Sequence, residues 1–353
     1  MRPTRRLITF RVLPGLAVIG LLLSLAAPTF AQRPTTVKLA TLVPERSVWG
    51  VLLRNLTEEW KTTTDGRVQA RIYPGGVAGD DPDIVRKMRI GQLQAATITV
   101  TGLAEIDEAF NVFSIPLFYE SYDEYFYVLD SLEPVLRERL EAKGFIFLHW
   151  GHGGWVHLFA TQPVKTVEDL KSLKLFVWAG SDRLVSWWKD NGYRPVPLAL
   201  TDALPAMQTG MIEAVPSTPL AALSLQWYRQ TPYMLDLGVA PLIGATVITK
   251  RGWSKISPQD QQKILTASQR AAESFEVEIA AQDASAIAEM KKRGLTVDVI
   301  TDPANQTGWT EEAESFAAHF SEAFMPQEIY VMARKARDEF RARSIAPEPE
   351  PDN

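Results

Sequence analysis

The feature that most constrains the fold is a regular alternation of apolar runs and helical patterns between Pro163 and Pro219. The predicted elements are strand 173–178, helix 183–191, strand 193–198, helix 203–208 and strand 211–219. Turn-forming and capping residues separate them, such as Gly180-Ser181-Asp182 before the first helix. Strands that alternate with helices at this spacing predict an α/β fold.

The alternation continues on both sides of this stretch, from Thr36 to Arg343. Before it, we expect strand 36–44, helix 48–62, strand 67–73, helix 83–90, strand 95–100 with its end at 101–103, a helical hairpin over 122–143, and strand 145–150 with a Gly-rich loop. After it, we expect helix 220–227, strand 245–249, helix 258–293, strand 297–300 and mostly helix over 310–343. The period of the apolar residues supports these assignments.

Residues 1–31 have the features of a secretory signal peptide. Four arginines precede an apolar run over 12–27, and Thr29-Phe30-Ala31 offers small residues for cleavage after Ala31. A membrane anchor is the alternative, but the apolar run is shorter than the ~20 residues that a membrane-spanning helix needs. We therefore expect a soluble periplasmic protein that begins near Gln32.

Charge and cysteine content exclude several classes of protein. Removing the four arginines of residues 1–31 leaves 33 basic and 42 acidic residues, a net charge of about −9. Nucleic-acid binding needs a basic surface, so we expect no nucleic-acid partner. The chain has no cysteine, which excludes disulfides and thiolate metal sites. About 320 residues support one large or two medium domains.

Motifs for catalysis or metal binding are scarce. His149, His152 and His157 lie close in sequence, but on a strand, loop and strand they do not obviously converge on a metal. Gly75–Gly79 is interpreted as a turn rather than a phosphate loop, because no Lys-Ser/Thr follows it. Neither Gly-x-Ser-x-Gly nor His-Glu-x-x-His occurs. We expect no enzyme activity, no cofactor and no metal site.

Two segments carry a resemblance to a known family. Glu168-Asp169-Leu170-Lys171-Ser172-Leu173-Lys174-Leu175 is followed by Met207-Gln208-Thr209-Gly210-Met211-Ile212-Glu213-Ala214. Their order resembles the core of the substrate-binding proteins of tripartite ATP-independent periplasmic (TRAP) transporters, dicarboxylate-binding (DctP) type. In that family the first segment is Asp-Leu-x-Gly-x-Lys-Ile-Arg, and an acidic-Gly pair ends the second. Here Ser172 replaces the Gly, Phe176 replaces the Arg, and Glu213-Ala214 takes the place of the pair.

The resemblance implies a fold and partners. It implies a two-domain α/β solute-binding protein with a hinged cleft and long C-terminal helices. Domain I is expected over 36–154 and 245–295, and domain II over 155–244 and 296–343; residues 344–353 are Pro/Glu-rich and expected to be disordered. The implied partners are the integral-membrane TRAP subunits, which import the solute. Some members of a divergent branch also occur with a periplasmic tetratricopeptide-repeat partner.

The same resemblance bears on the ligand. The family Arg at the Phe176 position usually pairs with a substrate carboxylate, and a second basic position falls near Val156. Both positions are apolar here, which predicts an apolar or amphipathic ligand. The expected ligand-binding residues are Trp49, Thr101, Trp155, Phe176, Trp178, Ser217, Thr218 and Trp227.

Three alternatives stay open at this point. The aromatic residues among the expected ligand-binding residues are also typical of a buried core. A small carboxylate could bind through a relocated basic residue such as Arg183 or Arg229. A secreted hydrolase or lyase on a similar fold would need a nucleophile or an acid/base pair in the cleft, and the sequence shows none.

Overall fold

A computed structural model describes residues 33–345, without the side chains of 274–281 and 344–345. The expected signal peptide lies outside the described residues, as does most of the expected disordered tail. Helix α12 (Gln327–Ile345) extends two residues into that tail. Among the described helices, none is both long and apolar enough to cross a membrane.

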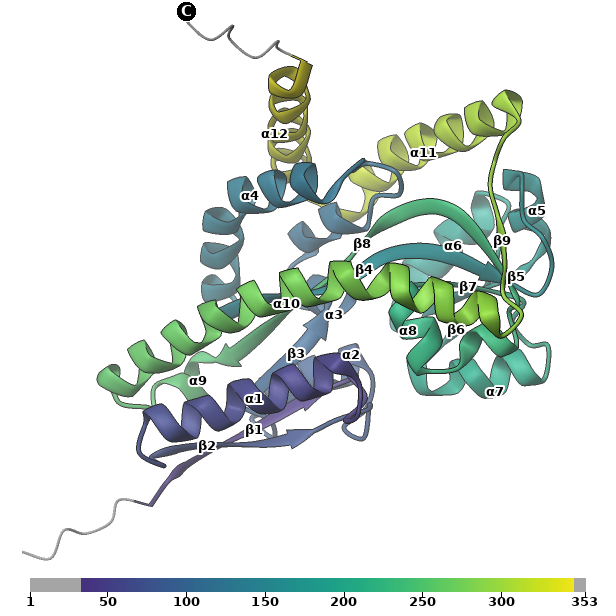
Figure 1. The fold of residues 1–353 in the computed structure, drawn as a ribbon. Coiled ribbons are helices and arrows are strands. Elements are labelled where there is room, and N and C mark those ends of the chain that lie inside the picture. Colours follow the sequence, from purple (N-terminus) through teal and green to yellow (C-terminus); the bar gives the residue numbers. More distant parts are fainter. Residues whose placement is uncertain (1–32, 346–353) are drawn as a thin grey trace, which may run out of the picture. The chain divides into compact units, whose positions relative to one another are not determined.

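One sheet organises the described chain, and its strands fall into two parallel sets joined by two long strands (Figure 1). The first set is β1 (Thr35–Thr41), β2 (Val68–Tyr73) and β3 (Ala95–Thr99); the second set is β5 (Lys174–Trp178), β6 (Arg194–Leu198) and β7 (Ala214–Ser217); the long strands are β4 (Phe145–Ala160) and β8 (Tyr233–Thr249). The order is β2-β1-β3-β8-β4-β7-β5-β6, and β9 (Thr296–Asp298) pairs with β8. Both sets pair antiparallel with the long strands.

Helices begin where polar residues can cap them. Ser47, Ser121 and Ser257 accept hydrogen bonds from main-chain N–H groups of the first turn of their helices. The other helices are α2 (Asp81–Arg89), α3 (Val100–Ile106), α5 (Val167–Ser172), α6 (Asp182–Asp190), α7 (Ala203–Gln208), α8 (Pro219–Ser224), α9 (Lys250–Trp253) and α11 (Pro303–Phe324), with 3₁₀ turns η1 (Glu108–Ser114), η2 (Leu200–Asp202) and η3 (Trp227–Arg229). The three serine-capped helices are α1 (Val48–Thr63), α4 (Tyr122–Ala142) and α10 (Pro258–Lys292).

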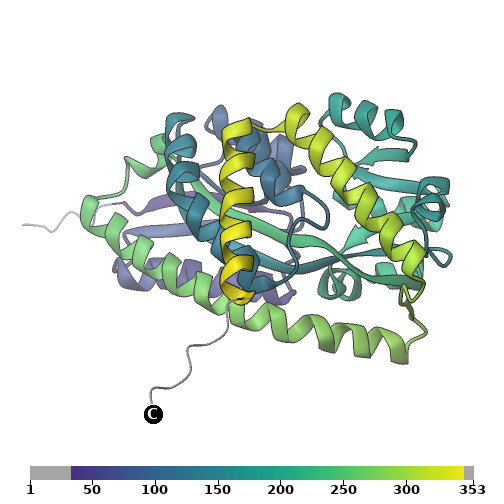
Figure 2. The ribbon, with the colours of Figure 1, turned by 90° about the horizontal axis from the view of Figure 1, so that it is seen from above.

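Two helices tie distant parts together. Helix α10 contacts α1, β4 and α8, so it runs along β4 and reaches elements beside both sets of strands (Figure 1). Helix α12 packs beside α4, as Figures 1 and 2 both show. The largest core cluster joins α4 and α12 to β3 and the first half of β4, whereas a smaller cluster around Phe176 and Trp227 fills the second set. Each set of strands thus has its own core.

The structure departs from the sequence predictions at several elements, among them β8, which begins at Tyr233 rather than at Ala245. Residues 101–103 belong to α3 rather than to a strand end, because the Thr99 side chain caps a helix there. Residues 122–142 form one helix rather than a hairpin, although Pro134 lies inside it. Leu132 and Leu136 are buried on either side of that proline, and their packing offsets its lost hydrogen bond. The expected Gly-rich loop is part of β4, which continues to Ala160 through three register shifts.

Candidate functional site

The register of the strands places the carboxyl ends of both sets at the middle of β4. At the end of β3, Thr99 pairs with Gly244 of β8, which pairs with Gly151 of β4. At the end of β7, Ser217 pairs with His157 of β4. The two sets run in opposite directions, so their carboxyl ends face the same short stretch from Gly151 to His157. Ligands of open α/β sheets bind outside the carboxyl ends of strands, which makes this stretch the candidate site.

Close packing shapes this stretch. A Cβ atom at Gly153 would lie 2.5 Å from the Leu242 side chain. Gly154 has a φ of +99°, and the Asp283 carboxylate occupies the space that a Cβ atom there would need. Asp283, on α10, accepts a hydrogen bond from the main-chain N–H of Trp155 (3.0 Å) and another from that of Leu220 (3.2 Å). Burial raises the pKa of Asp283 to about 6. Asp283 thus links β4, α8 and α10 behind the strand ends.

The segments that follow the strands of the first set contact those of the second set. We call the residues at this contact the junction. From the first set the junction includes Leu42, Gly76, Asp80 and Pro82; from the second it includes Trp178, Gly180, Leu200 and Thr201. The nearest approaches are between Gly180 and Pro82 and between Gly76 and Thr201, where an added Cβ would lie 2.8 Å and 3.0 Å from the facing side chain. Nothing larger than glycine fits either position without movement.

The first set contributes polar groups beside the junction. Asp81 is fully buried, and its Oδ2 accepts hydrogen bonds from Thr99 N (3.0 Å) and Thr99 Oγ1 (2.5 Å). Burial raises the pKa of Asp81 to about 7, although these hydrogen bonds oppose the shift. Burial also raises the pKa of the neighbouring Asp80. On this side Asp80 is half-buried, whereas Asp81 is fully buried and engaged by Thr99.

The second set contributes apolar groups. Trp178 and Leu200 are half-buried and pack against the core clusters of both sets. Phe176 is 2% exposed, and its ring centroid lies 5.5 Å from that of Trp178. None of these eight junction residues is Lys or Arg, although Lys87 Nζ donates to the carbonyl oxygen of Ala78, in the loop between Gly76 and Asp80. A ligand on this side would meet aromatic and aliphatic surface.

The residues expected from the sequence fall into two groups. Thr101, Trp155 and Trp178 are half-buried at or near the strand ends, where a ligand could reach them. The other five are buried: Trp49, Phe176, Ser217, Thr218 and Trp227. Trp49 Nε1 donates to the carbonyl oxygen of His152, and Thr218 caps α8. In this structure these buried groups support the site rather than line it.

The two alternative anchors for a carboxylate are engaged elsewhere. Arg183 lies 3.4 Å from Glu108 and over the ring of Phe324. Arg229 is exposed and hydrogen-bonds the side chain of Tyr228. Sequence reasoning missed Asp80, Asp81 and Leu200. The Asp-Asp-Pro start of α2 signals a helix cap, but nothing local indicates its contact with Leu200, 120 residues away.

The histidines of strand β4 are buried or half-buried. Burial lowers the pKa of His149 and of His152 to about 4, so both are neutral near pH 7. Within residues 33–345, leaving aside the side chains not described, no group of three or more His, Asp and Glu side chains could hold a metal ion. The ring of His152 packs edge-on against Phe126, as expected of a core side chain.

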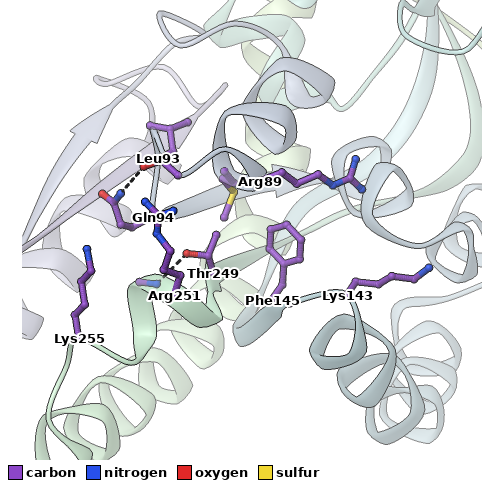
Figure 3. A pocket seen from close by; sticks show the side chains of 12 residues that line it. Arg89, Leu93, Gln94, Lys143, Phe145, Thr249, Arg251 and Lys255 are labelled. Atoms are coloured by element: carbon purple, nitrogen blue, oxygen red, sulfur yellow. Dashed lines mark hydrogen bonds between the residues drawn. The ribbon is translucent and has the colours of Figure 1, made fainter.

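A separate pocket of about 230 Å³ lies at the opposite ends of β3 and β4, away from the junction (Figure 3). Four basic side chains line it, from Arg89, Lys143, Arg251 and Lys255. Figure 3 shows that Arg89 and Lys143 extend away from Arg251, and Arg89 donates to the carbonyl oxygen of Glu105. Because the cations diverge, this pocket is a weaker candidate than the junction.

Comparisons with known proteins agree with the resemblance seen in the sequence. Residues 39–323 match the bacterial extracellular solute-binding protein family 7. A solute-binding protein of Chromohalobacter salexigens is 27% identical over 274 residues, which cover 77% of this chain and 81% of the relative. The 2,3-diketo-L-gulonate-binding periplasmic protein of Escherichia coli is 24% identical and covers 68% of this chain and 73% of its own length.

Solved structures share the fold. An extracytoplasmic solute receptor of Bordetella pertussis that binds pyroglutamic acid superposes with a TM-score of 0.79 at 17% identity, covering 86% of this chain and 99% of the receptor. A TRAP periplasmic solute-binding protein of Chromohalobacter salexigens with bound D-glucuronate gives 0.77 at 22% identity, with coverage of 86% and 99%. The chain belongs to the bacterial extracellular solute-binding protein family 7, the solute receptors of TRAP transporters.

Proposed function

We propose that this receptor binds a small organic solute with a large apolar part and delivers it to the membrane subunits of a TRAP transporter. The observation that carries the proposal is the composition of the junction. The strand ends of both sets face the middle of β4. The junction residues include the aromatic Trp178 and the aliphatic Leu200, and none of the eight is Lys or Arg. The solute would lie against these side chains.

Desolvation explains why the missing cation matters. A small dicarboxylate that enters a closed site loses its hydration, and burying an ionised carboxylate is costly unless it is paired and hydrogen-bonded. Phe176 and Val156 cannot supply that pairing, whereas apolar contact contributes roughly 25 cal/mol per Å². We infer that the solute is apolar or amphipathic, with at most one weakly anchored acid group.

We further propose a division into two domains that close on the solute. The expected boundaries at 154/155 and 244/245 fall inside β4 and β8, which would bend there. The core clusters of the two sets, which share only partly buried residues such as Trp178 and Leu200, support this division. The protein would act in the periplasm after removal of residues 1–31, with a tetratricopeptide-repeat protein as a further partner.

A small carboxylate is the second candidate ligand. The similar receptors with pyroglutamic acid and D-glucuronate bind carboxylates. Arg183 would be the relocated anchor nearest in sequence to the junction residues, if it left Glu108. The third alternative, a secreted hydrolase or lyase, is wrong, because the family consists of solute receptors rather than enzymes.

A ligand panel tests the proposal. C4-dicarboxylates, 2-oxo acids, sugar acids and medium-to-long fatty acids would be titrated by calorimetry and tryptophan fluorescence. We expect a fatty acid to bind at least tenfold more tightly than any dicarboxylate or sugar acid, without conversion to product. Micromolar binding of a dicarboxylate that Phe176→Arg does not improve would instead favour a relocated anchor.

A further inference from the structure

One side chain of the junction makes hydrogen bonds in two directions. Asp80 caps α2, because its Oδ1 accepts a hydrogen bond from Asp81 N at 3.0 Å. Its Oδ2 accepts a second hydrogen bond from Leu200 N at 3.1 Å, at the start of η2. Asp80 follows β2 of the first set, and Leu200 follows β6 of the second. A single carboxylate therefore connects the two sets.

The surroundings of Asp80 make this connection specific to one arrangement. Gly76 contacts Thr201 and Gly180 contacts Pro82 on either side of it, so all three contacts break together if the two sets separate. No cation neutralises the carboxylate within 4.0 Å among the described residues. The N–H groups of Asp81 and Leu200 stabilise its charge, whereas burial, Asp83 and Asp202 oppose it. Losing Leu200 N would leave the cap of α2 intact but remove the link.

We propose that Asp80 is a latch, a positioning residue that stabilises the arrangement in which the two sets are in contact. This inference rests on the proposed function, because a receptor that releases its solute must separate the two sets. A hydrogen bond to a charged group contributes roughly ten- to hundredfold to an equilibrium. The latch would therefore set how readily the site opens.

The substitution Asp80→Ser separates the two roles of the residue. Serine is about as good a helix cap as aspartate, but its short hydroxyl cannot also reach Leu200 N. Asp302→Ser is the matched control, because Asp302 caps α11 through Ala304 N and is exposed. Thermal unfolding should show a similar, small loss of stability in both variants.

A second pair of variants removes the link from the donor side. Leu200→Pro deletes the N–H group at the first position of η2, where proline is tolerated. Ala199 has φ −69° and ψ 151°, which suits a residue before proline. Leu200→Ala is the control, because it trims the side chain but keeps the N–H group. The donor-side pair decides the question if Asp80→Ser does not fold.

The measurement is the distance across the junction without any ligand. The chain has no cysteine, so Ile90→Cys with Met211→Cys places two spin labels at exposed positions, 57% and 52% accessible, on the two sides. Double electron–electron resonance should show that Asp80→Ser and Leu200→Pro lower the ratio of short to long distances roughly tenfold. Asp302→Ser should leave that ratio unchanged, and Leu200→Ala should lower it less than Leu200→Pro.

Two results would overturn the inference. One is an Asp80→Ser distribution equal to that of the wild type, with Leu200→Pro equal to Leu200→Ala. The other is a wild type that already shows the long distance alone, since no latch then acts. Neither result depends on a ligand. The experiment can therefore contradict the role of Asp80 without contradicting the proposed ligand class, and the ligand panel can do the reverse.

Discussion

The two sides of the junction differ in chemistry although both are built from the ends of parallel strands. The first set places the half-buried Asp80 at the junction, with Asp81 fully buried beneath it and bonded to Thr99, whereas the second presents Trp178 and Leu200. A solute that satisfies both sides needs an apolar part for the second set and a neutral hydrogen-bonding part for the first. The difference between the two sides therefore predicts both the chemical class of the ligand and its orientation in the site.

The largest expected effect concerns the charge of the first side, through Asp81→Asn. The pKa of Asp81 is about 7 in the folded protein, against ~3.9 ordinarily. Between these values the folded chain binds the proton more tightly than the unfolded chain, so this group makes the free energy of unfolding fall as pH rises from about 4 to 7. Asparagine does not ionise. The free energy of unfolding of the variant, relative to that of the wild type, should therefore rise by up to about 4 kcal/mol between pH 4 and pH 7.

Urea unfolding at several pH values measures that difference. His149 and His152 have lowered pKa values and act in the opposite direction, so they raise stability as pH rises from about 4 to 6.5. Subtracting the wild-type curve from the variant curve removes their contribution. A constant difference between pH 4 and pH 7 would mean that Asp81 is ionised throughout and that the first side is anionic.

The next effect concerns the apolar side. Trp178→Ala should weaken binding of the tightest fatty acid of the panel between tenfold and a hundredfold, because loss of ~100 Å² of apolar contact costs about 2.5 kcal/mol. Thr101→Val, on the first side, should change that affinity no more than a few-fold. Calorimetry on both variants compares the two sides directly. Equal losses would show that the two sides do not differ in the way described.

A cation introduced at the middle of β4 should reverse the preference for ligands. Val156 is half-buried there, between the strand ends of the two sets. Val156→Arg should raise the affinity for a dicarboxylate such as succinate roughly tenfold, since a charged hydrogen bond contributes about 1.5–3 kcal/mol. Val156→Leu is the control for side-chain size. If Val156→Arg does not raise the affinity for succinate, the ligand does not bind over the stretch from Gly151 to His157.

The smallest expected effect tests the relocated anchor. Arg183 is more than half exposed, and an exposed ion pair such as that with Glu108 contributes less than about 1 kcal/mol. Arg183→Ala should leave affinity for every ligand of the panel within about twofold of the wild type. A loss above tenfold for carboxylates, and not for a neutral ligand, would show that Arg183 anchors the acid group.

The sequence predicted most elements, but not the contacts that build the site. Alternating patterns indicated the strands of both sets because each buries its own apolar residues. The continuation of β4 through Gly153 and Gly154 depends on Leu242 and Asp283, which lie far away in the sequence. The helix that starts at Val100 likewise depends on Thr99 and the buried Asp81.

Local patterns reach only part of the candidate site. Trp178 ends β5, as the strand predicted over 173–178 implies, and Trp155 lies inside β4; their contact with a ligand stays a prediction. Phe176 and Trp227 are packed in one core cluster, which follows from the arrangement of the second set rather than from any pattern. Hydrogen bonds between the two sets, such as that from Leu200 to Asp80, have no counterpart in the sequence.

The most direct test of the account is the identity of the solute that the protein carries. Receptor purified from its native periplasm without refolding would be studied by native mass spectrometry, and the bound compound released and fragmented. The account predicts a compound with a continuous apolar part and at most one carboxylate. A sugar acid or a small dicarboxylate, bound one to one, would contradict it.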